Sequence, residues 1–296
     1  MALRDPHRPA PALKLLSLGA GVQSSTLLLL AARGAIPTFD YALFADTGWE
    51  PPAVYQHLQR IEAVAADAGI PLLRVAAGNI RDDALDPRHR FAGMPLFIHG
   101  PHGEHRMGRR QCTSEYKVRP LKREARRLLG YPHPARVPTG IYAEQAIGIS
   151  VDEVHRAKDA DVGYLRNVFP LLDIGWTRRD CAAFLTLHGL GDTPKSACIG
   201  CPFRSNESWA EMRATDPASF EDAVAFDAAI RHGPPGATAR GMPLHGTAYL
   251  HRDRIPLEQV DLGIDTGPEP DGCSPWSCRG SEEPDGADAD NDGGDR

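Results

Sequence analysis

The first 76 residues alternate short apolar runs with helical segments, and this alternation constrains the fold more than any other feature of the chain. Apolar runs of strand length cover 13–18, 41–45 and 71–76. Helical segments follow the first two runs, over 26–33 and 51–68, and each is followed by a glycine. Buried strands that alternate with helices predict parallel βαβ units. We therefore expect an α/β fold, a doubly wound parallel sheet of about five strands with a ligand site at their carboxyl ends.

Beyond residue 76 the periodic pattern is weaker. The stretch 79–111 contains proline, glycine and several histidines, and its length predicts a functional loop or lid. Thr177 and Asp180 have the spacing of a capping box, which predicts a helix from there to His188. The other expected elements are helices at 114–129, 206–212 and 217–230 and strands at 136–141 and 167–173.

Composition sets the expected domain boundaries. The chain of 296 residues is 42% hydrophobic, which is enough to bury a core. Residues 281–296 hold seven acids and one arginine, a net charge of −6 that equals the net charge of the whole chain. We expect a flexible arm over 1–12, one nucleotide-binding domain with a cysteine-rich C-terminal part over 13–265, and a disordered acidic tail over 266–296. The sequence shows neither a membrane-spanning run nor a secretion signal, so we expect a cytoplasmic protein without a membrane partner.

The cysteines suggest metal or redox chemistry. Without a secretion signal, a disulfide framework is the weaker interpretation of six cysteines. Cys198-x-x-Cys201 lies on a glycine turn, a spacing that lets two thiolates reach one metal ion or cluster. Cys181 lies on an apolar helical face and is predicted to pack in the core. The remaining cysteines are Cys112, Cys273 and Cys278.

Positive charge is concentrated around Cys112. The window 106–127 holds nine lysines and arginines and two glutamates. Two interpretations stay open, a solvated helix face and a site for phosphate or nucleic acid. Lys117 follows Cys112 at helical spacing and is the residue that we predict to contact phosphate.

A glycine- and serine-rich loop, 19–25, connects the first strand to the first helix. Backbone amides of such a loop, with the positive end of the helix dipole, make a site for phosphate or pyrophosphate. The loop lacks the lysine of a P-loop NTPase and the Gly-x-Gly-x-x-Gly pattern of dinucleotide-binding proteins. An ordinary turn with serine caps is the alternative interpretation.

Six segments, in order, resemble motifs of the PAPS reductase-like family of PP-loop ATP pyrophosphatases. Residues 20–25 resemble the Ser-Gly-Gly-x-Asp-Ser loop, and 44–50 resemble the Asp-Thr-Gly end of the second strand. The other four matches are Cys112 with Lys117 and Pro120, Gly140-Ile141 with Glu144, Pro170-Leu171 with Trp176-Thr177 and Asp180, and Cys198 to Phe203.

The chain also departs from that family. Gln23 and Ser24 stand where the phosphate loop usually has lysine and aspartate, and Tyr142 replaces an arginine. The Glu-Cys-Gly-x-His ending that carries the catalytic cysteine of the reductases is missing. These departures argue against sulfonucleotide reduction as that family performs it.

The resemblance implies a Rossmann-like adenine nucleotide α-hydrolase (HUP-type) fold that binds ATP or PAPS with Mg²⁺. It implies adenylation of an acceptor with release of pyrophosphate, followed by sulfur transfer to a nucleic acid or small molecule with a sulfur donor protein and a [4Fe–4S] cluster. Zinc is the alternative metal. PAPS reduction and a non-catalytic nucleotide- or nucleic-acid-binding role are the alternative functions. The implied catalytic residues are Asp46, Lys117 and Cys112; the nucleotide contacts are Gly19, Gly21, Gln23, Ser24, Ser25, Asp46, Gly48 and Gly140; the metal ligands are Cys112, Cys198 and Cys201.

Overall fold

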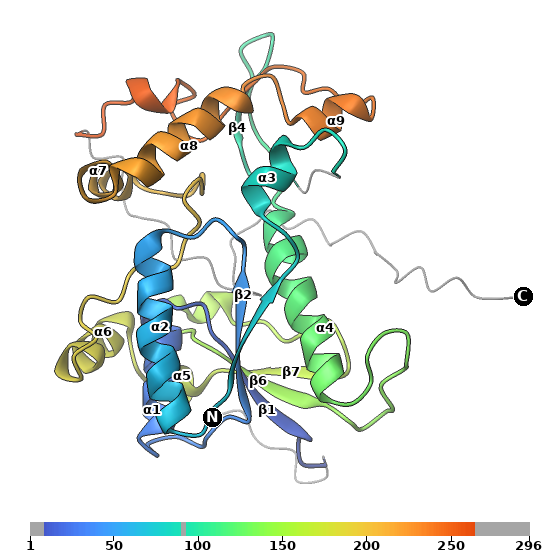
Figure 1. The fold of residues 1–296 in the computed structure, drawn as a ribbon, viewed down its shortest axis with the longest axis vertical. Helices are drawn as coiled ribbons and strands as arrows, with labels where there is room; N and C mark the ends of the chain where they lie inside the picture. Colours follow the sequence, from blue (N-terminus) through green and yellow to red (C-terminus); the bar gives the residue numbers. More distant parts are fainter. Residues whose placement is uncertain (1–8, 90–92, 264–296) are drawn as a thin grey trace, which may run out of the picture.

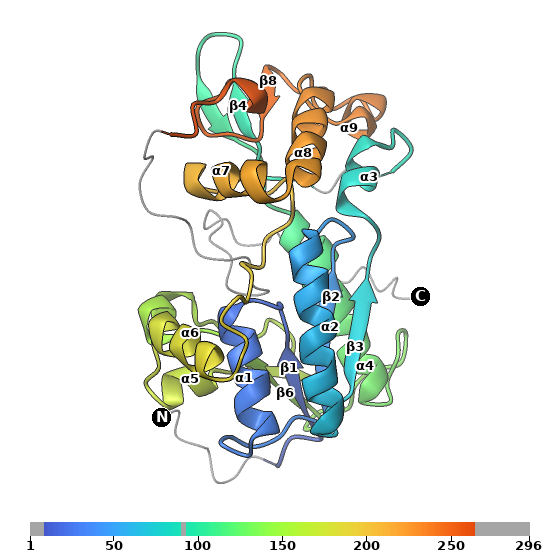
Figure 2. The ribbon, with the colours of Figure 1, turned by 60° about the vertical axis from the view of Figure 1, so that its left-hand side comes forward.

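A five-stranded parallel sheet forms the centre of the protein. The structure is a computed structural model that describes residues 9–89 and 93–263. The sheet has the order β3-β2-β1-β6-β7 (Figures 1 and 2). Its strands are β1 (Leu13–Ser17), β2 (Tyr41–Asp46), β3 (Leu72–Ala76), β6 (Ala143–Ile147) and β7 (Leu165–Val168). The chain builds outward from β1 to β3 and then returns to the other side of β1, so the strand order reverses between β1 and β6. The expected doubly wound α/β fold is confirmed.

Strand register brings two turns to the same edge of this sheet. β1 pairs with β6 from Leu13 opposite Ala143 to Ser17 opposite Ile147. The two strands therefore end level with each other, and the segments that follow them meet at the point where the strand order reverses. Ligands of open α/β sheets bind in the crevice at such a point.

Helices cover both faces of the sheet. α1 (Val22–Ala32), α2 (Pro52–Asp67), α5 (Pro170–Asp173) and α6 (Arg178–Leu187) lie on one face, and α4 (Arg119–Leu128) lies on the other. Successive strand residues face opposite sides, so Leu16 packs in the first core and its neighbour Leu15 in the second. Burial on both faces explains why these strands are continuous apolar runs in the sequence.

A smaller unit lies beside the carboxyl ends of the strands, at the top of Figure 1. It has its own core, in which Trp209 and Phe226 are fully buried. Its antiparallel sheet has the order β5-β4-β8. The elements are α3 (Ile80–Leu85), β4 (Phe97–His99), β5 (His105–Met107), α7 (Asn206–Thr215), α8 (Pro217–Ala229), α9 (Pro235–Ala239), β8 (Thr247–Tyr249) and the 3-10 turn η3 (Leu257–Gln259).

Several expected elements need correction. The stretch 79–111 is not a plain loop, because it contributes α3, β4 and β5. No strand forms at 136–141; the inner strand is β6, since Pro138 cannot donate a hydrogen bond to a neighbouring strand. The expected strand at 167–173 is divided between β7 and α5, which begins at Pro170.

Other expectations are confirmed. The capping box of Thr177 and Asp180 is formed at the start of α6. The helix expected at 114–129 forms as a π-helical turn, η1 (Ser114–Val118), followed by α4. A 3-10 turn, η2 (Val151–Arg156), follows β6. The predictions for residues 1–8 of the arm and for the acidic tail lie outside the described residues. Across 9–89 and 93–263, no helix has both the length and the apolar character needed to cross a membrane.

Candidate nucleotide site and cysteine pocket

The loop between β1 and α1 is a tight turn that opens onto the start of a helix. Gly21 is the N-cap of α1 and offers no side chain, so no side-chain cap satisfies the first amides of the helix. Ser24 Oγ accepts a hydrogen bond from the Gly19 amide at 3.1 Å and donates one to the Gly21 carbonyl at 3.3 Å. The predicted loop is therefore held closed by its own serine, with free helix amides at its mouth.

The turn after β6 packs directly against this loop. A Cβ atom on Gly148 would lie 2.8 Å from the Ser24 nitrogen, so only glycine fits without a shift of the backbone. Gly140, the predicted nucleotide contact, precedes β6 and lies at the opposite end of the strands. The Gly-Ile…Glu pattern recurs at Gly148, Ile149 and Glu153, at the correct end of β6. The nucleotide contact of Gly140 stays a prediction, and the structure places Gly148 beside the loop.

Three basic residues that are not among the implied nucleotide contacts surround the loop. Arg156, Arg178 and Lys195 line a small pocket with Gly19, Gly21, Gln23 and Ser24. One carboxylate, Glu153, lines the same pocket and pairs with Arg156 at 2.8 Å, both side chains being buried. Three cations against one anion leave the pocket positively charged, which suits phosphate.

Gln23 connects these charged groups. Its amide nitrogen donates to Glu153 Oε2 at 3.1 Å, and its amide oxygen accepts from Arg178 at 2.9 Å. The glutamine that stands where the resembled family often has lysine thus holds an arginine at the loop. Gln23 carries no positive charge itself, but it binds Arg178 of α6, which brings a positive charge to the loop.

Behind the loop, Ser25 is bonded to a buried histidine of α2. Ser25 Oγ lies 2.9 Å from His57 Nε2, and His57 is only 2% exposed. Burial, with a smaller effect from the charge of Arg60, lowers the pKa of His57 from 6.5 to about 4. Its Nδ1 atom is buried without a hydrogen-bond partner among the described residues.

This histidine predicts a loss of stability in mild acid. Between pH 6.5 and 4 the unfolded chain takes up a proton at His57 and the folded chain does not, so stability is full above pH 6.5 and falls as the pH falls. We expect a contribution of roughly 2 kcal/mol between pH 7 and pH 5. Urea unfolding of wild type and His57→Gln at both pH values measures it. An equal loss in both proteins would contradict this assignment, because other groups, including buried His251, titrate in both.

Asp46 lies at the carboxyl end of β2. Its Oδ1 atom accepts hydrogen bonds from the Gly48 amide and the Tyr55 hydroxyl, each at 2.8 Å. Burial, and next the bond to Asp46, raise the pKa of Tyr55, so this hydroxyl stays a donor. Both bonds go to one oxygen, and neither Asp46 nor Gly48 lines the pocket at the loop.

The predicted cysteine ligands share a second small pocket. Cys112, Cys198 and Cys201 line it together with Thr47 and Lys117. Cys112 is the first residue of the helical segment that contains Lys117, while Cys198 and Cys201 lie on the turn before α7. Cys181, as expected, is fully buried, and burial raises the pKa of its thiol to about 12.

A buried ion pair adjoins this cysteine pocket and was not anticipated. Lys117 Nζ lies 3.7 Å from Glu50 Oε1, with side chains only 6% and 1% exposed. The same oxygen accepts from Thr47 Oγ1 at 3.1 Å and from Cys198 Sγ at 3.5 Å. Glu50 Oε2 is buried without a hydrogen-bond partner among the described residues. Glu50 is the last residue of the segment 44–50 that resembles the family motif, and this resemblance is the signal that could have marked it.

The fit to a metal is poor. Among residues 9–89 and 93–263, no three His, Cys, Asp or Glu side chains are arranged to hold a metal ion. The described cysteines form no disulfide bond, and Cys198 Sγ contacts Thr47 Oγ1 at 3.3 Å. The cysteine pocket is therefore not a formed metal site, and the cluster and zinc stay predictions.

Most of the basic segment on α4 is paired. Arg119 bonds Glu115 at 2.5 Å, and Lys122 bonds Asp161 at 2.7 Å. Arg126 donates to two backbone carbonyls, and Arg127 pairs with Glu124. These pairs favour the interpretation as a solvated helix face.

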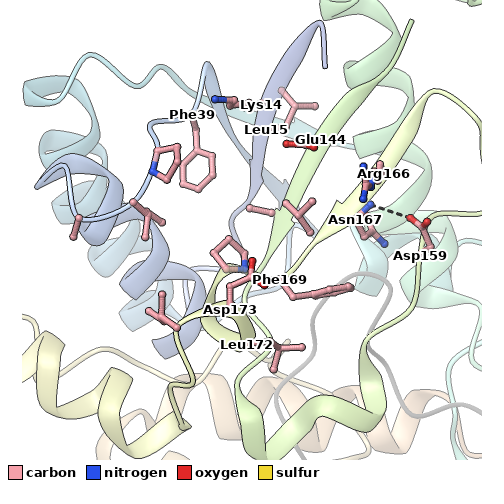
Figure 3. Close-up of a pocket in the computed structure, with 17 residues that line it drawn as sticks. Lys14, Leu15, Phe39, Glu144, Asp159, Arg166, Asn167, Phe169, Leu172 and Asp173 are labelled. Carbon is pink, nitrogen blue, oxygen red and sulfur yellow. Dashed lines mark hydrogen bonds between the residues drawn. The ribbon is translucent and has the colours of Figure 1, made fainter. Parts of the chain in front are cut away.

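A larger cavity lies elsewhere and contains none of the predicted site residues. It has a volume of about 650 Å³ and lies over the amino-terminal half of β1, β6 and β7 (Figure 3). Lys14, Glu144 and Arg166 form one cross-strand row on its floor. Phe39, Phe169 and Leu172 contribute to its apolar walls. The side chains that line this cavity carry charges of both signs, so they do not indicate one class of ligand.

Comparison with known proteins finds distant likenesses among solved structures. No protein-family model and no curated protein matches this chain. Its structure is similar to that of a phosphoadenylyl-sulfate (PAPS) reductase from Candida auris in complex with phosphate, with a TM-score of 0.36 and 13% sequence identity. The match covers 63% of this chain and 76% of that chain. A likeness at this level establishes neither a family nor an activity.

Proposed function

We propose that the chain binds ATP at the loop 19–25 and transfers its adenylyl group to an acceptor, with release of pyrophosphate. One observation carries the proposal: an uncapped helix start and three cations, Arg156, Arg178 and Lys195, surround the same loop at the switch point of the sheet. Helix amides and guanidinium groups both stabilise phosphate.

In this proposal the acceptor attacks the α-phosphate, and the bond to the leaving pyrophosphate breaks. Arg178 and Lys195 neutralise the charge that develops on the pyrophosphate, while the loop amides hold its oxygens. Such catalysis consists of positioning and charge stabilisation. The two hydrogen bonds to Asp46 both go to Oδ1, and its Oδ2 atom would hold a Mg²⁺ ion that the nucleotide brings. Lys117 and Cys112, in the cysteine pocket, belong to a second step at the acceptor.

The second step in this proposal is sulfur transfer to a nucleic acid or small molecule. Three thiols in one pocket favour it. A [4Fe–4S] cluster or zinc would need the cysteines to rearrange, so no step is assigned to either metal. The non-catalytic alternative is favoured by one observation, the serine at position 24 that offers no carboxylate in the loop.

Arg178→Ala tests the nucleotide site. We expect ATP affinity to fall by about 10- to 100-fold, since a hydrogen bond to a charged group contributes roughly 1.5–3 kcal/mol. Arg179→Ala is the matched control, because this exposed neighbour does not line the pocket. Isothermal titration with ATP and with PAPS measures binding, and AMP with pyrophosphate reports turnover.

Three results would change the proposal. An equal effect of both substitutions would place the nucleotide elsewhere. ATP binding without formation of AMP, with nucleic acid and sulfide added, would favour the non-catalytic role. Binding of PAPS in place of ATP would favour the reductase alternative.

A further inference from the structure

The cysteine pocket differs from a metal site in the bonds that its thiols make. Cys198 Sγ lies 3.3 Å from Thr47 Oγ1 and 3.5 Å from Glu50 Oε1. Both oxygens belong to the segment after β2, and Glu50 is in turn paired with Lys117. The Thr47 hydroxyl and the Glu50 carboxylate therefore hold the Cys198 sulfur at one place in the pocket.

The second thiol is brought near by a tight turn. The Cys201 amide donates to the Cys198 carbonyl at 3.2 Å, which makes 198–201 a hydrogen-bonded turn. The end residues of such a turn have Cα atoms within about 7 Å of each other, the range in which most disulfides form. Gly200 allows the turn to contact Trp49, because a Cβ at this position would lie 2.0 Å from the indole ring. Trp49 thus holds the turn in place from the same segment that holds Cys198.

We propose that Cys198 and Cys201 form a thiol–disulfide centre that exchanges with disulfides of low-molecular-weight thiols. The Cys198 sulfur attacks one sulfur of the substrate disulfide R–S–S–R, forming a mixed disulfide and releasing one R–SH. The Cys201 sulfur then attacks Cys198 Sγ, forming the Cys198–Cys201 bond and releasing the second R–SH. Two protein thiols are oxidised, one disulfide is reduced, and the two thiol protons leave on the two R–SH molecules. The proposed ATP site does not depend on this thiol–disulfide centre. Formation of the disulfide can be measured without any nucleotide, so the two proposals can fail separately.

Oxidised glutathione and dithiothreitol provide the test on the full chain, purified under argon. Free thiols are alkylated with iodoacetamide after each treatment, and tryptic peptides are analysed by mass spectrometry. Trypsin places both cysteines on one peptide, 196–204, because it cleaves after Lys195 and Arg204. After dithiothreitol we expect this peptide to carry two labels. After oxidised glutathione we expect it to carry none, with a mass two hydrogen atoms below that of the unlabelled dithiol peptide. Cys181, buried and unreactive, serves as the internal control.

Two variants test the order of the steps. Cys201→Ser should stop the reaction at the mixed disulfide, with glutathione attached to Cys198. Cys112→Ser is the matched control, since Cys112 lines the same pocket but lies outside the turn, and it should still form the 198–201 bond. The proposal is overturned if peptide 196–204 keeps both labels, if either cysteine pairs with another cysteine, or if the argon-purified protein holds stoichiometric iron or zinc that blocks the labels.

Discussion

Replacing Lys117 with methionine should lower the free energy of unfolding by about 3–5 kcal/mol. The substitution removes a charge and keeps the length and volume of the side chain. It leaves the Glu50 carboxylate almost fully buried, with Thr47 and Cys198 as its remaining hydrogen-bond donors and Oε2 without any. An unpaired buried charge is costly because the protein interior cannot replace the water that it has lost.

A double-mutant cycle separates this pair from other effects of the substitution. Glu50→Gln should also destabilise the fold, because it removes the carboxylate that pairs with the buried Lys117 ammonium group. The double variant should lose less than the sum of the two single losses, since neither charge is then left alone. Urea unfolding at pH 7, followed by circular dichroism, gives the three values.

Glu62→Gln is the control for this cycle. It breaks the ion pair with Arg74, which has a distance of 2.7 Å but side chains 40% and 44% exposed. Exposed pairs contribute about 0–1 kcal/mol. A loss for Lys117→Met no larger than that of this control would contradict a stabilising ion pair between Lys117 and Glu50.

The parts of the fold that the sequence predicted are those in which local patterns decide the structure. The strands and helices between 13 and 76 are apolar runs that end at glycines, and each packs beside its neighbour in sequence. The meeting of Cys112 with Cys198 and Cys201 was implied by the family resemblance alone, and the three cysteines line one pocket. The chemical roles of these residues stay predictions.

The parts that could not be predicted depend on contacts between distant segments. β6 has the sequence Ala-Glu-Gln-Ala-Ile and does not look like an inner strand. Gln145 is fully buried there, and its side chain has no hydrogen-bond partner among the described residues. This polar strand led the sequence analysis to 136–141 and hence to Gly140. β4 was missed for another reason, since β8, one of its two partners in the small sheet, lies far along the chain.

The Gly148→Ala substitution should cause a second large effect, a loss of nucleotide binding, because Gly148 packs against the loop. The added methyl group would lie 2.8 Å from the Ser24 nitrogen and 2.9 Å from the Gln23 carbonyl carbon. Both are backbone atoms of the loop and cannot turn aside as a flexible side chain would. The loop has to move away from the turn, and its amides then no longer converge on one phosphate. We expect ATP affinity to fall by at least about 10-fold and the free energy of unfolding by about 1–3 kcal/mol.

Gly163→Ala makes the same chemical change without the contact. A Cβ on Gly163 meets no atom within 4 Å, and its backbone does not need glycine. We expect its stability to stay within about 0.5 kcal/mol of wild type and its ATP affinity to be unchanged. Circular dichroism and thermal unfolding establish that each variant is folded before ATP binding is measured by titration calorimetry. If folded Gly148→Ala binds ATP as wild type does, the nucleotide does not depend on the loop beside Ser24. The site would then have to lie outside the switch point of the sheet, because no other turn there approaches the loop backbone through a glycine as closely as Gly148 does among the described residues.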